Sequence, residues 1–440
     1  MKVMLRGDTA GVEQLIRFIP NNRVVGIMGA SIRSQYLMDL ADISNGLNVP
    51  LIIQPRVDSA EYSQYLINLH NTDADFLWIN SYSMIIRPDA LAEFPKGGVN
   101  IHMAPLPRFR GCNPIQWAII NDEKEMGVTL HEVVPELDAG PIIDQRRLPL
   151  LFEDSWESAR SRLNKATDEL IAANAESILS GDWLSKEQDH KLASYGPRRY
   201  PADGEVSLKE PLIDIYNKIR ALLPPLPPAF VESDCGVRRE FTSILSPMQL
   251  LEEKYVGGGL KHMSSERFKL RPLRKEDSDP LYEWITDRDL VVFNSSFKPI
   301  SENEHSDWML SVLKERNDLM FFVIEDLESS TAIGTCQLTN INWIHRSAEL
   351  QIRIGDVHYQ GRGLGGEAVR LLCEFGFHDL NLHRIHLQVW ATNTRAIAAY
   401  QKVGFKQEGE HAEAAFIDGR FIDVVTMALL KSNVSKGKEE

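Results

Sequence analysis

Cysteines are few in this sequence, and their spacing indicates no shared role. Cys112, Cys235, Cys336 and Cys373 are widely separated, and no two of them form a C-x-x-C pair. Disulfide frameworks and cysteine-ligated zinc sites show recurrent cysteine spacings, which are missing here. The sequence therefore predicts neither, and we expect reduced thiols and no bound metal.

Long hydrophobic runs are also missing. No run approaches the ~18 apolar residues of a membrane-spanning helix, and the first residues, MKVMLRGDTAG, contain no signal-peptide core. We therefore expect a cytoplasmic protein that has no membrane partner.

Basic residues are outnumbered by acidic ones. The 48 lysines and arginines stand against 62 aspartates and glutamates, which gives a formal net charge of -14 at pH 7. Because such a surface repels a phosphate backbone, this balance argues against nucleic acid as a partner, tRNA included.

The sequence does have the length and composition of a multidomain globular protein. Its 440 residues are 43% hydrophobic and 25% charged, and a chain this long usually folds around two or three cores. Short apolar stretches alternate with helix-like segments near the amino terminus: 2–5, 24–28, 51–54 and 76–79. This alternation predicts an α/β fold with a doubly wound parallel sheet. No G-x-G-x-x-G motif follows the first stretch, so a nicotinamide cofactor is not indicated.

The segment VNIHMAP at 99–105 carries the strongest chemical signal. Residues 99–103 have the pattern of a short strand, on which Asn100 and His102 project to the same face. Pro105 ends the strand, so the pair lies where an open α/β sheet binds its ligands. Further along the chain, Asp138 lies in a turn-like LDAGP segment that brings a carboxylate toward the imidazole.

These three side chains suit the transfer of a small acyl group to an amine. His102 would take a proton from the attacking amine, and Asp138 would orient the imidazole and stabilise its charged form. The amide of Asn100 would donate a hydrogen bond to the developing oxyanion. The plain alternative is a buried histidine satisfied by an aspartate of the core.

The same residues resemble the N-x-H pair and distal aspartate of the 10-formyltetrahydrofolate-dependent formyltransferases. This family includes methionyl-tRNA formyltransferase and the nucleotide-sugar N-formyltransferases. Further matches follow in order along the chain: Leu106-Pro107, Arg110-Gly111, Pro114-Ile115, Trp117-Ala118, Gly127-Val128-Thr129 and Asp138-Ala139-Gly140. One departure is Ala104, where the family usually has serine. The resemblance implies 10-formyltetrahydrofolate as the donor, with its pterin near Ile85 and Ile86 and its folate beside Asp138.

The resemblance also suggests domain boundaries. A Rossmann-like catalytic domain is expected at 1–182, and a small carboxy-terminal extension of it at 183–245. One helix is predicted over 155–179, with Asp154 or Ser155 as its cap and Gly181 at its end. Three consecutive glycines favour a flexible linker at 246–267. The second domain is expected at 268–432, and a solvated tail at 433–440.

A glycine-rich turn dominates the second domain. Strands are predicted at 268–272, 320–325, 332–340 and 348–354. The sequence YQGRGLGGEA then joins the last strand to a helix that starts near Gly365. Bare backbone amides at a helix amino terminus favour the binding of a pyrophosphate group.

This turn, Q-x-x-G-x-G at 360–365, and the later Asn393, Ala396, Tyr400 and Gly404-Phe405 resemble the GNAT family of acetyl-CoA-dependent N-acetyltransferases, which have an α+β fold. The resemblance implies a pyrophosphate site made by Gln360 and by the amides of Gly361, Gly363, Leu364 and Gly365. Asn393 would then contact the pantetheine arm, and Tyr400 would protonate the departing thiolate. Glu349 is the candidate base, acting directly or through water. The plain alternatives are a packed aromatic for Tyr400 and a solvated strand face for Glu349.

Together these features predict a bifunctional acyltransferase. The implied acceptor is a nucleotide-linked amino-dideoxy sugar, and our specific hypothesis is a UDP-linked 4-amino-4,6-dideoxy sugar of pseudaminic acid biosynthesis. One alternative is an enzyme like methionyl-tRNA formyltransferase. Another is a formyltransferase whose second domain only binds CoA or dimerises. Whether the chain forms a homodimer is left open. A third is an N-terminal binding module without catalysis, against which the intact Asn100, His102 and Asp138 argue.

Overall fold

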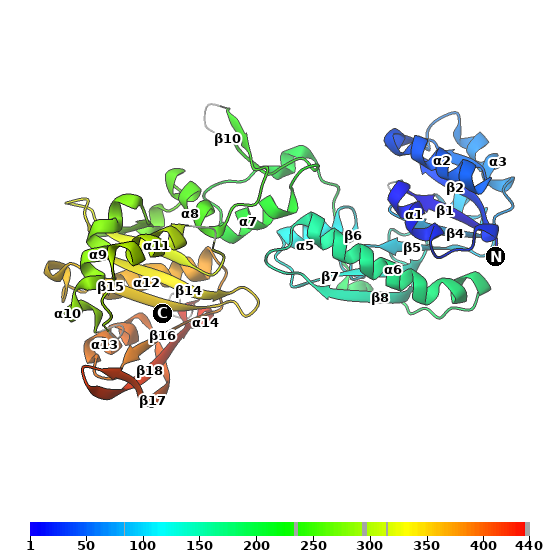
Figure 1. Cartoon of the computed structure of the whole chain (residues 1–440). Helices are drawn as coiled ribbons and strands as arrows, with labels where there is room; N and C mark the ends of the chain where they lie inside the picture. The colour runs from blue at the N-terminus through cyan, green and yellow to red at the C-terminus, as the bar shows by residue number, and fades with distance from the viewer. Residues whose placement is uncertain (83, 233–235, 293–296, 314–315, 436–440) are drawn as a thin grey trace. The chain divides into compact units, whose positions relative to one another are not determined.

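The computed structural model describes residues 1–82, 84–232, 236–292, 297–313 and 316–435 (Figure 1). Cys235 and the last part of the predicted tail, 436–440, lie outside the described residues. The chain separates into two compact units, Met1–Asp203 and Gly204–Glu440. Within the described residues, no helix is both long enough and apolar enough to cross a bilayer.

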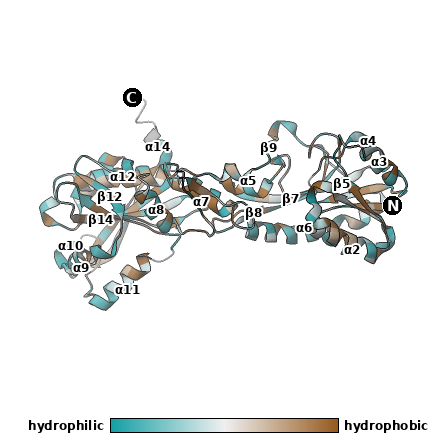
Figure 2. Cartoon of the chain, turned by 90° about the horizontal axis from the view of Figure 1, so that it is seen from above, coloured by the Kyte–Doolittle hydropathy of each residue, from teal (hydrophilic) through white to brown (hydrophobic). Residues whose placement is uncertain are grey.

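The N-terminal unit is built on a seven-stranded sheet with the order β3-β2-β1-β4-β5-β7-β8. Its strands are β1 (Val3–Gly7), β2 (Val24–Ala30), β3 (Leu51–Gln54), β4 (Phe76–Asn80), β5 (Gly98–His102), β7 (Glu125–Glu132) and β8 (Ile142–Pro149). The first five strands are parallel, whereas β7 and β8 add antiparallel pairings at one edge. The predicted doubly wound α/β fold is confirmed, and Figure 2 shows hydrophobic residues along the strands around β5.

Helices cover this sheet, and short pairings tie down its loops. The helices are α1 (Thr9–Ile16), α2 (Leu37–Leu47), α3 (Tyr62–His70), α4 (Pro88–Leu91), α5 (Pro114–Ile120) and α6 (Trp156–Ser180). The predicted helix over 155–179 corresponds to α6, whose N-cap is Ser155 and whose end is the left-handed Gly181. A two-stranded pairing of β6 (Arg110–Gly111) with β9 (Tyr195–Gly196) fastens the loop that follows β5.

The C-terminal unit contains a second seven-stranded sheet, with the order β12-β13-β14-β15-β16-β18-β17. Its strands are β12 (Phe268–Pro272), β13 (Met320–Asp326), β14 (Ala332–Asn342), β15 (Ser347–Ile354), β16 (Arg384–Trp390), β17 (Lys406–Ile417) and β18 (Arg420–Leu430). Helix α12 (Leu364–His378) packs on β14 and β15 (Figure 1). The other helices after β12 are α9 (Ser278–Thr286), α10 (Arg288–Val291), α11 (Glu302–Leu313), α13 (Thr394–Val403) and α14 (Lys431–Ser435).

Strands β15 and β16 are paired along only part of their length. They run parallel and are matched over Ser347–Glu349 against Arg384–His386, and the described residues of the two strands are not paired beyond this point. Every other neighbouring pair in this sheet is antiparallel. The two strands therefore separate beyond Glu349, and an opening is left in the middle of the sheet.

The segment between the two sheets differs from the expected linker. It contains α7 (Leu212–Ala221), the hairpin β10 (Phe230–Glu232) and β11 (Arg238–Glu240), and α8 (Pro247–Val256). The expected extension at 183–245 thus divides at Asp203, and its second part belongs to the C-terminal unit. Helix α8 lies inside the expected linker at 246–267, is capped by Ser246, and buries Leu250 and Leu251. The three glycines come directly after this helix, and Gly257 is its C-cap. This segment is therefore a packed element and not a flexible joint.

A buried ion pair fastens α8 to the end of α12. The ammonium of Lys254 pairs with the carboxylate of Asp379, and both side chains are almost completely buried. Burial alone would raise the pKa of Asp379, but hydrogen bonds from His262 and Lys254 hold this pKa below its usual value. The backbone carbonyl of Asp379 also accepts a hydrogen bond from Ile213 of α7. Helices α7 and α8 are therefore integral parts of the C-terminal unit.

We expect Lys254→Ala to destabilise the C-terminal unit by about 3 kcal/mol or more, because it leaves a buried carboxylate without its cation. Hydrogen exchange at the amides of α8 and α12 in the full chain would report this loss as a lower local unfolding free energy. The matched control is Glu252→Ala on the exposed side of the same helix, which should change the free energy by less than about 0.5 kcal/mol. Equal exchange in the two variants would contradict the role of this ion pair.

Candidate functional site

The structure brings Asn100, His102 and Asp138 together at the carboxyl end of β5. The amide nitrogen of Asn100 donates to Asp138 Oδ1 at 3.3 Å. Nδ1 of His102 lies 3.6 Å from Asp138 Oδ2, and the side chains of both residues are only 10% exposed. A carboxamide, an imidazole and a carboxylate therefore share one nearly dry site, where electrostatic interactions are stronger than in water.

The His102 ring is held by the loop that follows its strand. Its Nε2 lies 2.8 Å from the backbone carbonyl oxygen of Phe109, and because that oxygen only accepts, Nε2 must carry the proton. In the neutral ring the lone pair is then on Nδ1, the nitrogen that faces Asp138. A proton taken up at Nδ1 would create an imidazolium beside the carboxylate. Phe109 reaches this position with a left-handed backbone at a φ of 57°.

Asp138 is fixed from several directions. Its Oδ2 accepts a 2.8 Å hydrogen bond from the amide of Gly111, and its backbone is left-handed at a φ of 51°. The side chain of Gln188 donates to the carbonyl oxygens of Asp138 and Gly140. Gln188 in turn accepts two hydrogen bonds from the buried guanidinium of Arg110. The carboxylate is therefore positioned before any substrate arrives.

His131 is a fourth member of this cluster that the sequence interpretation missed. It lies on β7 directly opposite Asn100, and the Asn100 amide nitrogen is 3.1 Å from its Nε2. His131 Nδ1 donates to the carbonyl oxygen of Glu132, so Nε2 is free to accept. The amino group of Asn100 therefore points at His131 and Asp138. The GVTLHE motif contains this histidine, but the register that pairs β5 with β7 cannot be read from the sequence.

Burial lowers the pKa of His131 to about 4. Because an unfolded histidine keeps a pKa near 6.5, the unfolded chain binds more protons between these two values, and acid favours unfolding. We expect the N-terminal unit to lose about 2 kcal/mol between pH 7 and about pH 5 from this group. Hydrogen exchange of β5 and β7 as a function of pH would measure the loss. His131→Gln should remove this part of the pH dependence; an unchanged pH profile would contradict the assignment.

The predicted pterin neighbours lie in the loop after β4. Ile85 is 70% exposed, and its carbonyl oxygen accepts a hydrogen bond from Gln54. Ile86 packs partly against the hydrophobic core. A cavity of about 490 Å³ in this unit is lined by α1, α6 and Ser81, and none of the predicted site residues lines it. The contact of Ile85 and Ile86 with the pterin stays a prediction.

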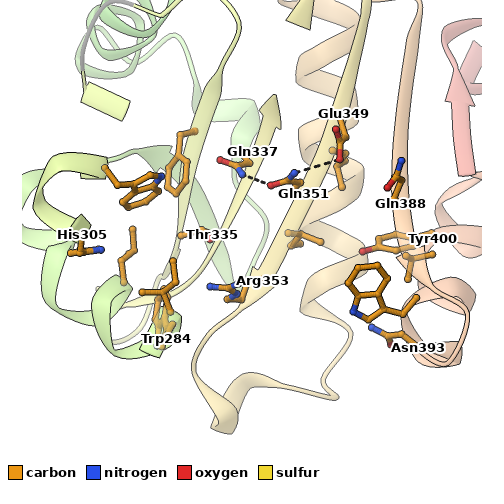
Figure 3. A pocket seen from close by; sticks show the side chains of 18 residues that line it. Trp284, His305, Thr335, Gln337, Glu349, Gln351, Arg353, Gln388, Asn393 and Tyr400 are labelled. Carbon is orange, nitrogen blue, oxygen red and sulfur yellow. Dashed lines mark hydrogen bonds between the residues drawn. The ribbon is translucent and has the colours of Figure 1, made fainter. Parts of the chain in front are cut away.

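The C-terminal unit contains a cavity of about 370 Å³ at the opening between β15 and β16. Residues of β14, β15 and β16 form its floor, and residues of α9, α11 and α13 form its walls (Figure 3). Three of the predicted site residues, Glu349, Asn393 and Tyr400, line it. The structure thus brings Glu349 together with two residues that follow it in the sequence by more than forty positions.

The glycine turn adjoins the end of β15. Gly361 and Gly363 have left-handed backbones, and a Cβ at either position would meet open space. Helix α12 begins at Leu364, one residue before the predicted start, and Gln360 closes the turn by donating to Ile354. Among the described residues, none accepts a hydrogen bond from the amides of Gly361, Gly363, Leu364 or Gly365. These amides are therefore available to an anionic ligand.

The three cavity residues differ in their environments. Burial raises the pKa of Tyr400 to about 12, so its hydroxyl stays protonated at neutral pH. Asn393 uses its side-chain oxygen to cap α13, which leaves its amino group for other contacts. Glu349 accepts hydrogen bonds from the side chains of Asn340 and Gln351. The side-chain oxygen of Gln351 accepts a hydrogen bond from Gln337 (Figure 3). The cavity therefore offers a proton donor and a carboxylate.

Comparison with known protein families identifies both units. A formyl transferase model matches residues 41–174, which include β5 and its cluster. An acetyltransferase (GNAT) domain model matches residues 267–406, which include the glycine turn and the cavity. The chain joins a formyl transferase domain to a GNAT acetyltransferase domain.

The GNAT domain is also similar to solved acetyltransferases. Spermidine N-acetyltransferase from Vibrio cholerae, in complex with CoA and spermine, is 32% identical, with 38% of this chain and 98% of that chain covered and a TM-score of 0.37. A dodecameric structure of spermidine N-acetyltransferase from the same organism is 31% identical, with 39% and 97% covered and a TM-score of 0.35.

Proposed function

We propose that this chain transfers a formyl group from 10-formyltetrahydrofolate to the amine of a nucleotide-linked amino sugar in its formyl transferase domain. Its GNAT domain is proposed to transfer an acetyl group from acetyl-CoA to an amine. The observation that carries the first activity is the convergence of Asn100, His102 and Asp138 in a nearly dry site. Asp138 contacts both of the other side chains, so the carboxylate links the amide to the imidazole at one place.

In the formyl transferase domain, the acceptor amine would attack the formyl carbon, and the carbon–nitrogen bond to the folate would break. His102 would take the proton that the amine releases and return it to the departing folate nitrogen. For this step, the ring proton would move from Nε2 to Nδ1, which faces Asp138. Nε2 would then leave the carbonyl oxygen of Phe109 and accept the proton from the amine. Asn100 would turn one amide hydrogen toward the developing oxyanion.

In the GNAT domain, the amine would attack the thioester carbon, and the carbon–sulfur bond would break. Glu349 would accept the proton from the amine, directly or through water, and the hydroxyl of Tyr400 would protonate the thiolate. The free amides of the glycine turn would bind the pyrophosphate. The fit is supported by Glu349 and Tyr400, which line one cavity.

A UDP-linked 4-amino-4,6-dideoxy sugar of pseudaminic acid biosynthesis is our specific acceptor for formylation. The net charge of -14 favours a small acceptor over tRNA. For the GNAT domain, a nucleotide-linked amino sugar is the first candidate acceptor, and the similarity to spermidine N-acetyltransferase makes a polyamine the second. The dodecameric relative supports the further proposal that this chain self-associates.

Mass spectrometry of acceptor panels tests this function. Nucleotide-linked amino sugars, methionyl-tRNA and spermidine are incubated separately with the full-length protein and one donor at a time. We expect a single formyl gain on an amino sugar with 10-formyltetrahydrofolate, and a single acetyl gain on an amine with acetyl-CoA. Formylation of methionyl-tRNA without formylation of any amino sugar would overturn the proposed acceptor.

A further inference from the structure

The cavity of the GNAT domain contains an arginine that the described part of the chain leaves without an ionic partner. Arg353 lies on β15 and lines the cavity (Figure 3). Its Nε is buried without a hydrogen-bond partner among the described residues. Within the part of the chain that the structure describes, no carboxylate lies within ion-pair distance of its guanidinium. Burial lowers the pKa of Arg353, and no neighbouring group offsets this effect.

Another arginine of the same domain, Arg271, has the ionic partners that Arg353 lacks among the described residues. Arg271 on β12 is buried and forms ion pairs with both Asp277 and Glu325. It also donates to a backbone carbonyl oxygen. Arg353 is only partly exposed and its Nε is buried without a partner in the described part of the chain, and removing part of a charge from water without compensation is costly. The partner that Arg353 lacks among the described residues is therefore expected in a ligand that occupies the cavity.

The cavity carries opposite charges on one strand face. Glu349 and Arg353 are four residues apart on β15, so their side chains project to the same face about 13 Å apart along the strand. Gln351 lies between them, and its side chain bonds to Glu349 and Gln337 (Figure 3). Thr335 on β14 is directly opposite Arg353 and lines the cavity as well. The floor therefore has a carboxylate end and a guanidinium end, separated by neutral polar groups.

From this arrangement we infer that the GNAT acceptor is an amine that also carries an oxyanion, with the amine placed at Glu349 and the oxyanion bound by Arg353. The inference rests on the proposed acetyltransferase function and adds the substrate class. The separation of the two charges favours an acceptor with its amine and anion at different ends. A nucleotide-linked amino sugar has this form. Free lysine has it too, because its side-chain amine is separated from its carboxylate.

A polyamine fits this cavity poorly. Spermidine presents cations along its whole length, so one of them would lie near the guanidinium of Arg353, where like charges repel in a poorly solvated space. An amine that carries an oxyanion therefore fits this cavity better than a polyamine does.

Steady-state acetylation by the full-length protein tests this inference. The acceptors are a UDP-linked amino sugar, the same amino sugar without its nucleotide diphosphate, free lysine, and spermidine. For the wild type, we expect kcat/KM to be at least tenfold higher for an acceptor with an oxyanion than for its counterpart without one. Arg353→Gln should raise the KM for that acceptor at least tenfold, and Arg353→Lys should recover part of the loss.

Affinity for acetyl-CoA distinguishes acceptor binding by Arg353 from donor binding. This affinity should be unchanged in Arg353→Gln, which also shows that the variant is folded; a loss confined to acetyl-CoA affinity would mean that Arg353 binds the donor. Acetylation of lysine but not of the amino sugar would overturn the proposed sugar acceptor and leave the inference standing. Spermidine acetylation by the wild type at an equal or higher kcat/KM than every anionic acceptor would overturn the inference.

Discussion

His102→Gln is expected to lower the rate of formyl transfer by about 100- to 10,000-fold, which is the usual contribution of a general base. Glutamine fills a similar space and can still donate to the carbonyl oxygen of Phe109, but it cannot take a proton from the amine. The fold of the site should therefore survive while proton transfer fails. Formyl transfer is measured as tetrahydrofolate release with a saturating acceptor.

Two controls accompany this variant. His70→Gln changes an exposed histidine of α3 in the same domain and should leave formyl transfer unchanged. Acetyl transfer by the same preparation of His102→Gln should also be unchanged, because the reaction takes place in the other domain. Formyl transfer within a factor of three of the wild type would exclude His102 as the base.

The second large effect is expected for Tyr400→Phe in the GNAT domain. Removing a general acid should lower acetyl transfer by about 100-fold or more, while the hydrophobic packing of the ring against Phe405 is retained. Affinity for acetyl-CoA should change little, because the hydroxyl acts on the departing thiolate. Release of free CoA thiol, measured with a thiol reagent, follows the reaction.

The pH dependence gives an independent check on Tyr400. Because burial raises its pKa to about 12, its hydroxyl remains a proton donor at neutral and mildly alkaline pH. The wild-type rate should therefore show no loss from tyrosine ionisation below about pH 10. Normal acetyl transfer by Tyr400→Phe would mean that this ring only packs and that another group protonates the thiolate.

Much of the fold could be predicted from the sequence, because its strands are short apolar runs with clear ends. The stretch 51–54 became β3 with the same bounds, and 268–272 became β12. The cap Ser155 and the terminating Gly181 bracket α6 as their backbone preferences require. These signals are local, so that no knowledge of the rest of the chain was needed.

The errors came where tertiary packing overrides local preference. Three consecutive glycines suggested a joint, yet the residues before them form α8, which is held by the pairing of Lys254 with Asp379. These partners are far apart in sequence, and no local pattern connects them. His131 and Arg353 were missed for a similar reason, because a strand register decides which residue lies opposite Asn100 and which side chain faces the cavity.

The central claim is that two separate sites transfer two different acyl groups. One experiment tests it most directly: the wild type, His102→Gln and Tyr400→Phe are each incubated with both donors and the acceptor panel, and the products are weighed by mass spectrometry. At equal early times, we predict both products from the wild type, about 100-fold or more less formylated product with normal acetylated product from His102→Gln, and the reverse from Tyr400→Phe. The claim would be contradicted if either single variant lost both products. It would also be contradicted if both variants formed both products at the wild-type rate.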